Sequence, residues 1–266
     1  MSRIEEALAK AAQRHIDMEP SRRGPESSLE APGPFNSDSI ANEKLVVLKT
    51  PASPEAEEFR KLKESLLKGG DKGRDMSDRN VFLITSPSHG EGKSLISANL
   101  ALSLAQEFDH TVLLVDADLR RPTCHKNLEI SSEVGLADCL IEGKRLDEVL
   151  IKTGIGKLML LPAGRSIKNP VEIISSNVMR QLLMEMKHRY SDRVILIDTP
   201  PVLMFAETRT LADLADGVVL VVREGDTSLA DVQEAIEILN GKVMGLVYNG
   251  TEFVQHSHYY YYQYSS

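Results

Sequence analysis

Seven short runs of apolar residues restrict the fold of this chain more than any other feature. The runs lie at 45–48, 81–84, 112–115, 158–161, 194–197, 218–222 and 243–247. Because they are uninterrupted rather than alternating with polar residues, they indicate strands buried on both faces, as in a parallel sheet. Helical patterns lie between them, at 54–68, 93–107, 171–189 and 228–239. This alternation predicts an α/β fold with a doubly wound, mainly parallel sheet and a ligand site at the carboxyl ends of its strands.

Three segments follow from the pattern. Residues 44–250 form the predicted folded domain. Residues 1–43 combine a short helical pattern at 2–15 with a linker rich in Pro, Ser, Gly and charge. Either the short helix frays in water, or it orders on a partner. Residues 251–266 form a polar tail that holds five of the seven tyrosines in the chain: Tyr259, Tyr260, Tyr261, Tyr262 and Tyr264.

Composition limits the classes of partner. The net charge of −8 argues against a nucleic-acid-binding protein, which usually carries a basic patch. The two cysteines, Cys124 and Cys139, form no disulfide framework and suit a reducing cytosol. No apolar run approaches the roughly 20 residues that cross a bilayer, and the first residues lack the apolar core of a signal peptide. We therefore expect a cytoplasmic protein that reaches a membrane only through a partner.

The segment ITSPSHGEGKSLISANLALSLA joins one apolar run to a helical pattern and has the composition of a phosphate-binding loop. Glycines allow backbone N–H groups to turn towards phosphate oxygens, and a helix N-terminus adds a positive dipole. Lys93 would reach the β- and γ-phosphates of a nucleotide, and Ser94 would ligate Mg²⁺. The usual first glycine is replaced by Pro87. The residues expected to bind ATP here are His89, Gly90, Glu91, Gly92, Lys93, Ser94 and Leu95.

Acidic residues follow two further apolar runs. Asp116 and Asp118 come after the run at 112–115, and Asp198 follows the run at 194–197. In a parallel sheet these strand ends converge on the phosphate-binding loop, where carboxylates can hold Mg²⁺ or accept a proton. We predict Ser94, Asp116 and Asp198 as metal ligands, and Lys93, Asp116, Asp118 and Asp198 as the catalytic set.

The three motifs together carry a family resemblance. SPSHGEGKS, VDADLRRP and ILIDTPP resemble the Walker A, Walker A′ and Walker B motifs of bacterial tyrosine kinases, the autokinases of capsule and exopolysaccharide assembly. The resemblance covers roughly residues 44–266, and the N-terminal segment resembles the exosortase-associated, chain-length-determinant branch. The related ParA/MinD partition ATPases carry a signature lysine where this chain has Ser88.

The resemblance implies an ATP- and Mg²⁺-dependent protein-tyrosine autokinase of the non-specific bacterial type. Its γ-phosphoryl group would pass to the C-terminal tyrosines, in trans within a ring of unphosphorylated subunits. A carboxylate would accept the phenolic proton, with Asp118 preferred to Asp116. Asn249 resembles the adenine-contacting asparagine of the wider superfamily, and an ordinary turn residue is an equally good reading.

The segment EEFRKLK at 57–63 resembles the E-x-x-R-x-x-R motif by which such kinases dock onto one another. Glu57, Arg60 and Lys63 would lie on the exposed side of a helix and form the oligomer interface. Lys63 stands where the motif has arginine, which removes bidentate geometry. The competing interpretation is a solvated charge ladder that contributes only a few tenths of a kcal/mol.

The resemblance also implies partners and a location. We expect the cytoplasmic end of a separate membrane polysaccharide co-polymerase as activator, a cognate tyrosine phosphatase, and a position peripheral to the inner membrane. The alternative function is a ParA/MinD-like positioning ATPase that acts as a nucleotide-controlled dimer switch. Ser88, the tyrosine tail and the lack of a C-terminal amphipathic helix weigh against it. A nonhydrolytic regulatory module is disfavoured by the intact acidic and P-loop residues.

Overall fold

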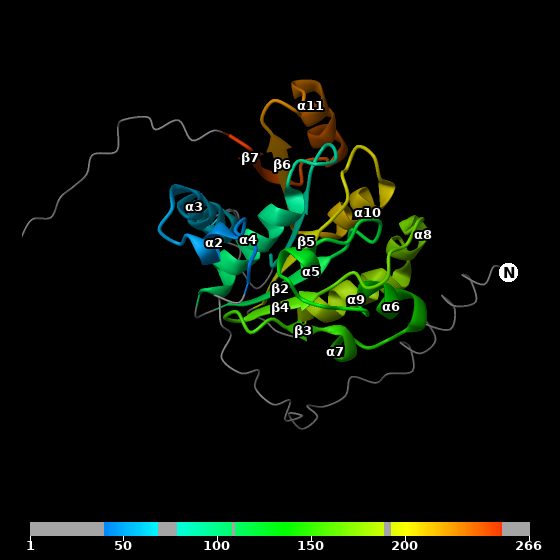
Figure 1. Ribbon diagram of the computed structural model, residues 1–266. Helices are drawn as coiled ribbons and strands as arrows, with labels where there is room; N and C mark the ends of the chain where they lie inside the picture. The colour runs from blue at the N-terminus through cyan, green and yellow to red at the C-terminus, as the bar shows by residue number, and fades with distance from the viewer. Residues whose placement is uncertain (1–39, 69–78, 108–109, 189–192, 252–266) are drawn as a thin grey trace, which may run out of the picture.

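The computed structural model describes residues 40–68, 79–107, 110–188 and 193–251, and these residues form a sheet with helices on both faces (Figure 1). Within this part of the chain the sheet has seven strands in the order β3-β4-β2-β5-β1-β6-β7. β3 pairs antiparallel with β4, and every other pairing is parallel. The strands are β1 Val81–Thr85, β2 Thr111–Asp116, β3 Ile151–Lys152, β4 Leu158–Leu161, β5 Arg193–Asp198, β6 Gly217–Arg223 and β7 Val243–Asn249.

Alternate residues of the central strands enter two separate cores. In β1, Val81 and Leu83 pack into one core, and Phe82 and Ile84 pack into the other, as the two-residue period of a strand requires. This confirms the predicted doubly wound, mainly parallel α/β fold. The helices are α2 Val46–Lys49, α3 Pro54–Lys68, α4 Lys93–Ala105, α5 Cys124–Asn127, α6 Leu136–Glu142, α7 Leu146–Val149, α8 Val171–Ile174, α9 Asn177–His188, α10 Ala206–Leu214 and α11 Leu229–Ile238.

Helix α4 is central to the arrangement that builds the site. Ten of its 13 residues, Ile96 to Ala105, are buried, because the sheet lies on one side of it and α2 and α3 lie on the other. A helix enclosed in this way has an apolar sequence on all sides rather than a single stripe. Its N-terminus follows the phosphate-binding loop directly, so the packing of α4 fixes the position of that loop relative to the strand ends.

The expected strand at 45–48 is wrong. This run forms the short helix α2, in which Val47 is buried and donates its N–H to Asn99 Oδ1 at 3.2 Å. Asn99 Nδ2 in turn donates to Lys44 O at 3.0 Å. A four-residue apolar run does not reveal its secondary structure by periodicity. Here the polar anchor on α4 holds the run over that helix instead of at an edge of the sheet.

Three further features differ from the sequence pattern. The single helix expected over 171–189 is divided into α8 and α9, because the Ser176 hydroxyl donates to Ile173 O and accepts from Met179 N, capping the second helix. β7 is an edge strand, and its Leu246 and Tyr248 are more than half exposed, although its apolar run predicted burial. The antiparallel strand β3 was also not anticipated.

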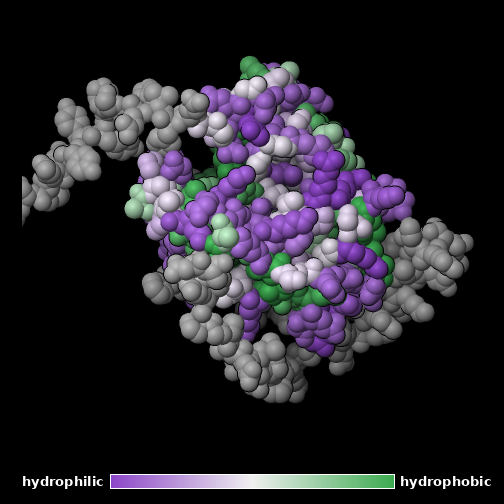
Figure 2. Space-filling model, in the orientation of Figure 1, coloured by the Kyte–Doolittle hydropathy of each residue, from purple (hydrophilic) through white to green (hydrophobic). Residues whose placement is uncertain are grey.

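The surface agrees with the charged composition of the chain. The face in Figure 2 is mainly hydrophilic, with hydrophobic residues confined to separate spots. Among the described residues, no helix combines the length and the apolar character that a membrane span requires.

Candidate active site

The loop between β1 and α4 contains two glycines in a backbone conformation that favours glycine. Gly90 and Gly92 have φ values of 83° and 88°, in the left-handed region that residues with a Cβ rarely adopt. A Cβ placed on Gly92 would also lie 2.2 Å from Asn249 Nδ2. The second glycine is thus required both by its own backbone and by a neighbouring side chain. Lys93 follows as the first residue of α4.

Asn249 connects the end of the sheet to this loop. It is the last residue of β7, and its Nδ2 donates to Glu91 O at 2.8 Å. It also lines a groove of about 680 Å³ between α3 and β7. The strand topology places it beside the loop, as expected, and adenine contact stays a prediction.

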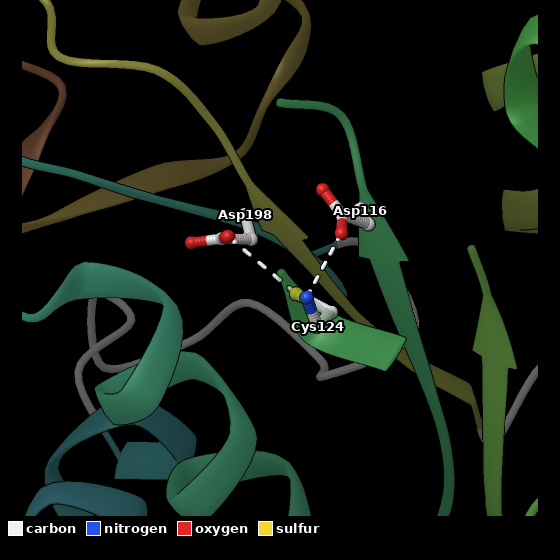
Figure 3. Close-up of side chains that lie close together, drawn as sticks. All are labelled: Asp116, Cys124 and Asp198. Atoms are coloured by element: carbon white, nitrogen blue, oxygen red, sulfur yellow. Dashed lines mark hydrogen bonds between the residues drawn. The ribbon is translucent and has the colours of Figure 1, made fainter. Parts of the chain in front are cut away.

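Two buried carboxylates lie side by side at the ends of neighbouring strands (Figure 3). Asp116 of β2 and Asp198 of β5 are paired in register, and neither is exposed to solvent. Asp116 Oδ2 accepts hydrogen bonds from the amides of Thr123 and Cys124, at 3.0 and 2.9 Å. Its Oδ1 has no partner among the described residues, although it is buried. Asp198 Oδ1 accepts from the Ser97 hydroxyl at 3.0 Å.

Burial and mutual proximity make it unfavourable for both carboxylates of this pair to be charged. Burial, and then the neighbouring charge of Asp198, raise the pKa of Asp116 to about 8. Burial also raises the pKa of Asp198, opposed by Lys93 and by the hydroxyls of Ser94 and Ser97. Oxygen atoms from two carboxylates and a hydroxyl suit Mg²⁺, and the unpartnered Oδ1 of Asp116 is a free donor. The predicted ligands Ser94, Asp116 and Asp198 therefore fit this ion.

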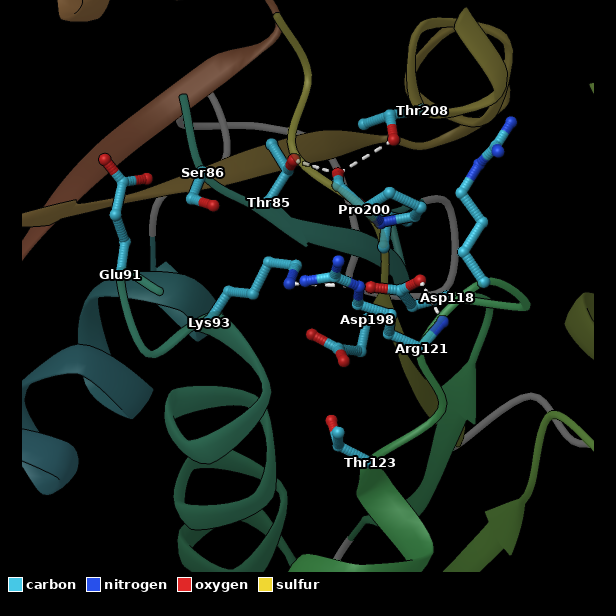
Figure 4. Close-up of polar contacts among 12 residues, drawn as sticks. Thr85, Ser86, Glu91, Lys93, Asp118, Arg121, Thr123, Asp198, Pro200 and Thr208 are labelled. Carbon is cyan, nitrogen blue, oxygen red and sulfur yellow. Dashed lines mark hydrogen bonds and ion pairs between the residues drawn. The ribbon is translucent and has the colours of Figure 1, made fainter. Parts of the chain in front are cut away.

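Lys93 and Asp118 meet at the mouth of the site (Figure 4). Lys93 Nζ lies 3.6 Å from Asp118 Oδ2, and both side chains are largely buried. Asp118 Oδ1 also accepts the amide of Arg121 at 3.0 Å, which fixes the carboxylate. Both residues line a cavity of about 310 Å³. Six of the predicted ATP-binding residues line the same cavity: His89, Gly90, Gly92, Lys93, Ser94 and Leu95.

Glu91 acts as a brace for the loop. Its buried carboxylate accepts the Ser88 amide at 3.0 Å and the Thr227 hydroxyl, and Figure 4 shows it directed away from Lys93. Arg223 Nη1 adds a hydrogen bond of 2.9 Å to Gly90 O. Sequence reasoning missed the roles of Arg223 and Thr227, because nothing in their local sequence indicates a contact with a loop more than 130 residues away.

The loop after Asp118 is anchored by a partly buried ion pair that the sequence motif did not reveal. Arg120 Nε lies 2.5 Å from Oε1 of Glu207, a residue of α10 with no exposed surface. The Arg120 guanidinium also lies 4.4 Å from the centre of the Phe205 ring, and that ring contacts His89 edge-on. Burial, followed by Arg121 and Lys93, lowers the pKa of His89, which favours a neutral imidazole. One network therefore joins α10, the Walker A′ loop and the phosphate-binding loop.

The predicted interface residues lie on α3, but not all on its exposed side. Glu57 and Arg60 form a surface ion pair. The Lys63 side chain is instead largely buried and forms an ion pair with Glu107. The expectation that all three side chains lie on the exposed side of the helix is therefore wrong for Lys63. The five tail tyrosines and the helix expected at 2–15 lie outside the described residues.

Comparisons with known proteins converge on one group. A family model described as an AAA domain matches residues 81–243. The tyrosine-protein kinase YwqD of Bacillus subtilis (strain 168) is 33% identical over 230 residues, covering 85% of this chain and 94% of that protein. CpsD of Streptococcus agalactiae, also a tyrosine-protein kinase, is 31% identical over 176 residues, covering 65% of this chain and 76% of that protein.

Solved structures agree. The kinase domain of Escherichia coli tyrosine kinase ETK has a TM-score of 0.71 at 28% identity, covering 78% of this chain and 80% of that one. The chimerical protein CapA2B2 gives 0.70 at 30% identity, covering 77% and 89%. MinD in the MinC:MinD complex of Aquifex aeolicus gives a lower TM-score of 0.55 at 26% identity, covering 65% and 69%.

Proposed function

Since this chain belongs to the bacterial tyrosine-protein kinases, an AAA-domain family, we propose that it phosphorylates tyrosines of its own C-terminal segment. The observation that supports this most strongly is the arrangement of Lys93, Asp116, Asp118 and Asp198 around one phosphate-binding loop. The acceptors are Tyr259, Tyr260, Tyr261, Tyr262 and Tyr264.

The chain's own groups divide the work of the reaction. The loop amides after Gly90 and the α4 N-terminus hold phosphate oxygens. Lys93 leaves its ion pair with Asp118 and binds the phosphoryl group that is transferred. Ser94, Asp116 and Asp198 hold Mg²⁺, which neutralises phosphate charge when bound. Asn249 contacts the adenine from the end of β7.

The structure supports Asp118 over Asp116 as the proton acceptor. The free phenol has a pKa of about 10, so a tyrosine enters the site protonated. Asp118 faces the cavity, whereas Asp116 has no exposed surface and a pKa raised to about 8. An aspartate without exposed surface that also serves as a Mg²⁺ ligand is poorly placed to reach a tyrosine hydroxyl, so we assign the role of proton acceptor to Asp118.

Incubation with Mg-ATP followed by phosphotyrosine mapping tests the proposal. Phosphate confined to the tail, and absent from Lys93→Met, is the expected result. Asp118→Asn should lose most of the phosphate while keeping ATP affinity. Full phosphorylation by Asp118→Asn would remove this residue from the role of base, and an unphosphorylated wild-type tail would overturn the proposal itself.

The alternative of a positioning ATPase rests only on the shared fold. MinD superposes less well than the kinase domains. Ser88 also occupies the position at which the ParA/MinD ATPases carry their signature lysine. ATP hydrolysis without phosphotyrosine is the result that would favour it.

The wider setting is also part of the proposal. The kinase regulates exopolysaccharide or capsule synthesis and export, assembles as a ring when unphosphorylated, and is activated at the inner membrane by a separate co-polymerase. A cognate phosphatase resets it. The exposed Leu246 and Tyr248, together with the groove beside α3, offer an apolar surface to a neighbouring subunit.

A further inference from the structure

A cysteine lies directly between the two buried aspartates of the active site. Cys124 is the first residue of α5 and is fully buried. Its amide donates to Asp116 Oδ2 at 2.9 Å, and its thiol donates a hydrogen bond to Asp198 Oδ2, with Sγ 3.5 Å from that oxygen (Figure 3). The thiol is thus held against the same carboxylates that are expected to bind Mg²⁺.

The three side chains present a compact set of donor atoms. One donor atom from each of Asp116, Cys124 and Asp198 lies within 4.8 Å of the other two. The second oxygen of Asp116 is buried without a partner among the described residues, which leaves a ligand position available. This orphan oxygen is an indication of a ligand that does not depend on the cysteine.

The spacing fits a particular kind of ion. With Zn–S of about 2.3 Å and Zn–O of about 2.0 Å, tetrahedral coordination separates sulfur and oxygen by about 3.5 Å. The Sγ and Oδ2 atoms of Cys124 and Asp198 are 3.5 Å apart. Mg²⁺ takes oxygen ligands and gains nothing from sulfur, whereas Zn²⁺ and Co²⁺ accept sulfur and carboxylate ligands together.

We infer that Asp116, Cys124 and Asp198 form a binding site for a thiophilic divalent cation such as Zn²⁺, which competes with Mg²⁺ for the two aspartates. On binding, the Cys124 sulfur forms a bond to the cation and its proton leaves to solvent. Thr123, the neighbour of Cys124, lines the cavity that Ser94 and Asp118 also line, so in this proposal the cation enters from that cavity. Occupation by this cation removes the aspartates from Mg²⁺ and inhibits the kinase.

Absorption spectroscopy with Co²⁺ tests the site without nucleotide and without activity. Coordination by a thiolate gives a sulfur-to-cobalt charge-transfer band, which histidine and carboxylate ligands do not give. The wild-type full chain should show this band, and Zn²⁺ should abolish it. Cys139→Ser is the matched control, because Cys139 is the other buried cysteine and lies in α6.

The expected result is a band that survives in Cys139→Ser and disappears in Cys124→Ser. Circular dichroism and the melting temperature establish that each variant is folded, and Cys124→Ala replaces Cys124→Ser if the latter is not. A wild-type protein without the band, or a band retained without Cys124, would overturn the inference.

Inhibition forms a second arm, and only this arm rests on the proposed kinase function. Each variant's phosphorylation is measured relative to its own rate with Mg²⁺ alone. Zn²⁺ should inhibit wild type and Cys139→Ser at concentrations at least tenfold lower than Cys124→Ser. Equal inhibition of all three, with the cobalt band present, would refute the competition and leave the binding site intact.

Discussion

At the scale of single residues, the phosphate-binding loop is constrained by the close approach of Gly92 and Asn249. Both Gly90 and Gly92 have positive φ, so Ala at either position meets the same backbone strain. Only at Gly92 would the new Cβ also meet Asn249, since nothing lies within 4 Å of a Cβ on Gly90. We expect Gly92→Ala to lose about tenfold more ATP affinity than Gly90→Ala, a difference of about 1.4 kcal/mol.

Calorimetric titration with ATP measures this difference. When both alanine variants also carry Asn249→Ala, which removes the proposed adenine contact equally from each, the difference between them should shrink, because the close contact at Gly92 is gone. Equal affinities for the two alanine variants would show that the Asn249 contact has no consequence for the loop.

The buried Asp116 predicts an unusual pH dependence of stability. Its pKa is raised to about 8, by burial and then by Asp198, so between pH 4 and 8 the folded protein binds a proton that the unfolded chain has released. Stability without Mg²⁺ therefore falls as pH rises through this range. Asp116→Asn should be the more stable protein at pH 8, by at least about 1.4 kcal/mol, the free energy that corresponds to a tenfold change in proton affinity.

Urea unfolding of wild type and Asp116→Asn at pH 5 and pH 8, in the presence of a chelator, measures the effect. The gain should be greater at pH 8, and Mg²⁺ should reduce it by stabilising the wild type. A gain that does not change with pH would contradict the assigned cause.

What the sequence could predict at this scale depended on motif geometry. Asp116, Asp118 and Asp198 lie near Lys93 because parallel strands end at one edge of the sheet. This proximity can be predicted from the arrangement of the strands alone, without knowledge of side-chain packing. The buried position of the Glu91 side chain depends on a hydrogen bond from the Thr227 hydroxyl, and Thr227 is distant from Glu91 in the sequence. The same holds for the place of Cys124 between the aspartates, which only the packing of α5 determines.

At the scale of elements, α10 holds the Walker A′ loop through Glu207. Arg120→Ala would leave that acid buried and uncompensated, and we expect a loss of about 3–5 kcal/mol in the free energy of unfolding. Arg121→Ala is the matched control, since Arg121 lines the cavity, and should change stability by about 0.5 kcal/mol or less. Urea unfolding distinguishes them.

Replacing both partners, as in Arg120→Met/Glu207→Leu, should restore much of the stability, because apolar side chains of similar volume need no partner. If Arg120→Ala is no less stable than Arg121→Ala, the buried pair does not anchor the loop.

Helix α3 carries the predicted subunit interface. Its surface ion pairs are exposed to solvent and contribute little to folding, so removing one leaves the monomer folded. Glu57→Ala/Arg60→Ala should therefore shift the oligomer to monomers without unfolding it. Glu64→Ala/Lys68→Ala removes another exposed pair of the same helix and should leave the oligomer unchanged. Light scattering after size exclusion measures both; an identical response would exclude a specific interface at Glu57 and Arg60.

The elements that sequence could not predict share a physical cause. The run at 45–48 is too short for its period to distinguish helix from strand. It forms a helix that is held against α4 by the hydrogen bond from Val47 N to Asn99 Oδ1. The division between α8 and α9 follows from a serine cap within a continuous helical pattern. Long buried strands were predicted correctly, because several successive apolar residues leave few other conformations.

At the scale of the whole molecule, topology joins the active site to the acceptor segment. β7 ends at Asn249, beside the phosphate-binding loop, and the described chain ends two residues later at Thr251. The ten residues from Asn249 to Tyr259 can span at most about 35 Å when extended, which is enough to reach the active site of the same subunit or of a neighbour. Mixing Lys93→Met, which keeps its tail, with a subunit shortened after Thr251 tests the route. Phosphate on the Lys93→Met tail is expected, and an unmodified tail would exclude transfer between subunits.

Phosphorylation should then disperse the assembly. Each phosphotyrosine adds about −1.5 to −2 charges. The chain has no Lys or Arg after Lys242 to offset them. A phosphorylated tail would therefore be repelled from a site that contains Asp116, Asp118 and Asp198. Light scattering before and after Mg-ATP should show oligomers converting to monomers, with Lys93→Met unchanged.

A variant with all five tail tyrosines replaced by Phe keeps an active site but should also stay oligomeric, which separates tail charge from nucleotide turnover. Persistent oligomers carrying confirmed phosphotyrosine would refute this coupling.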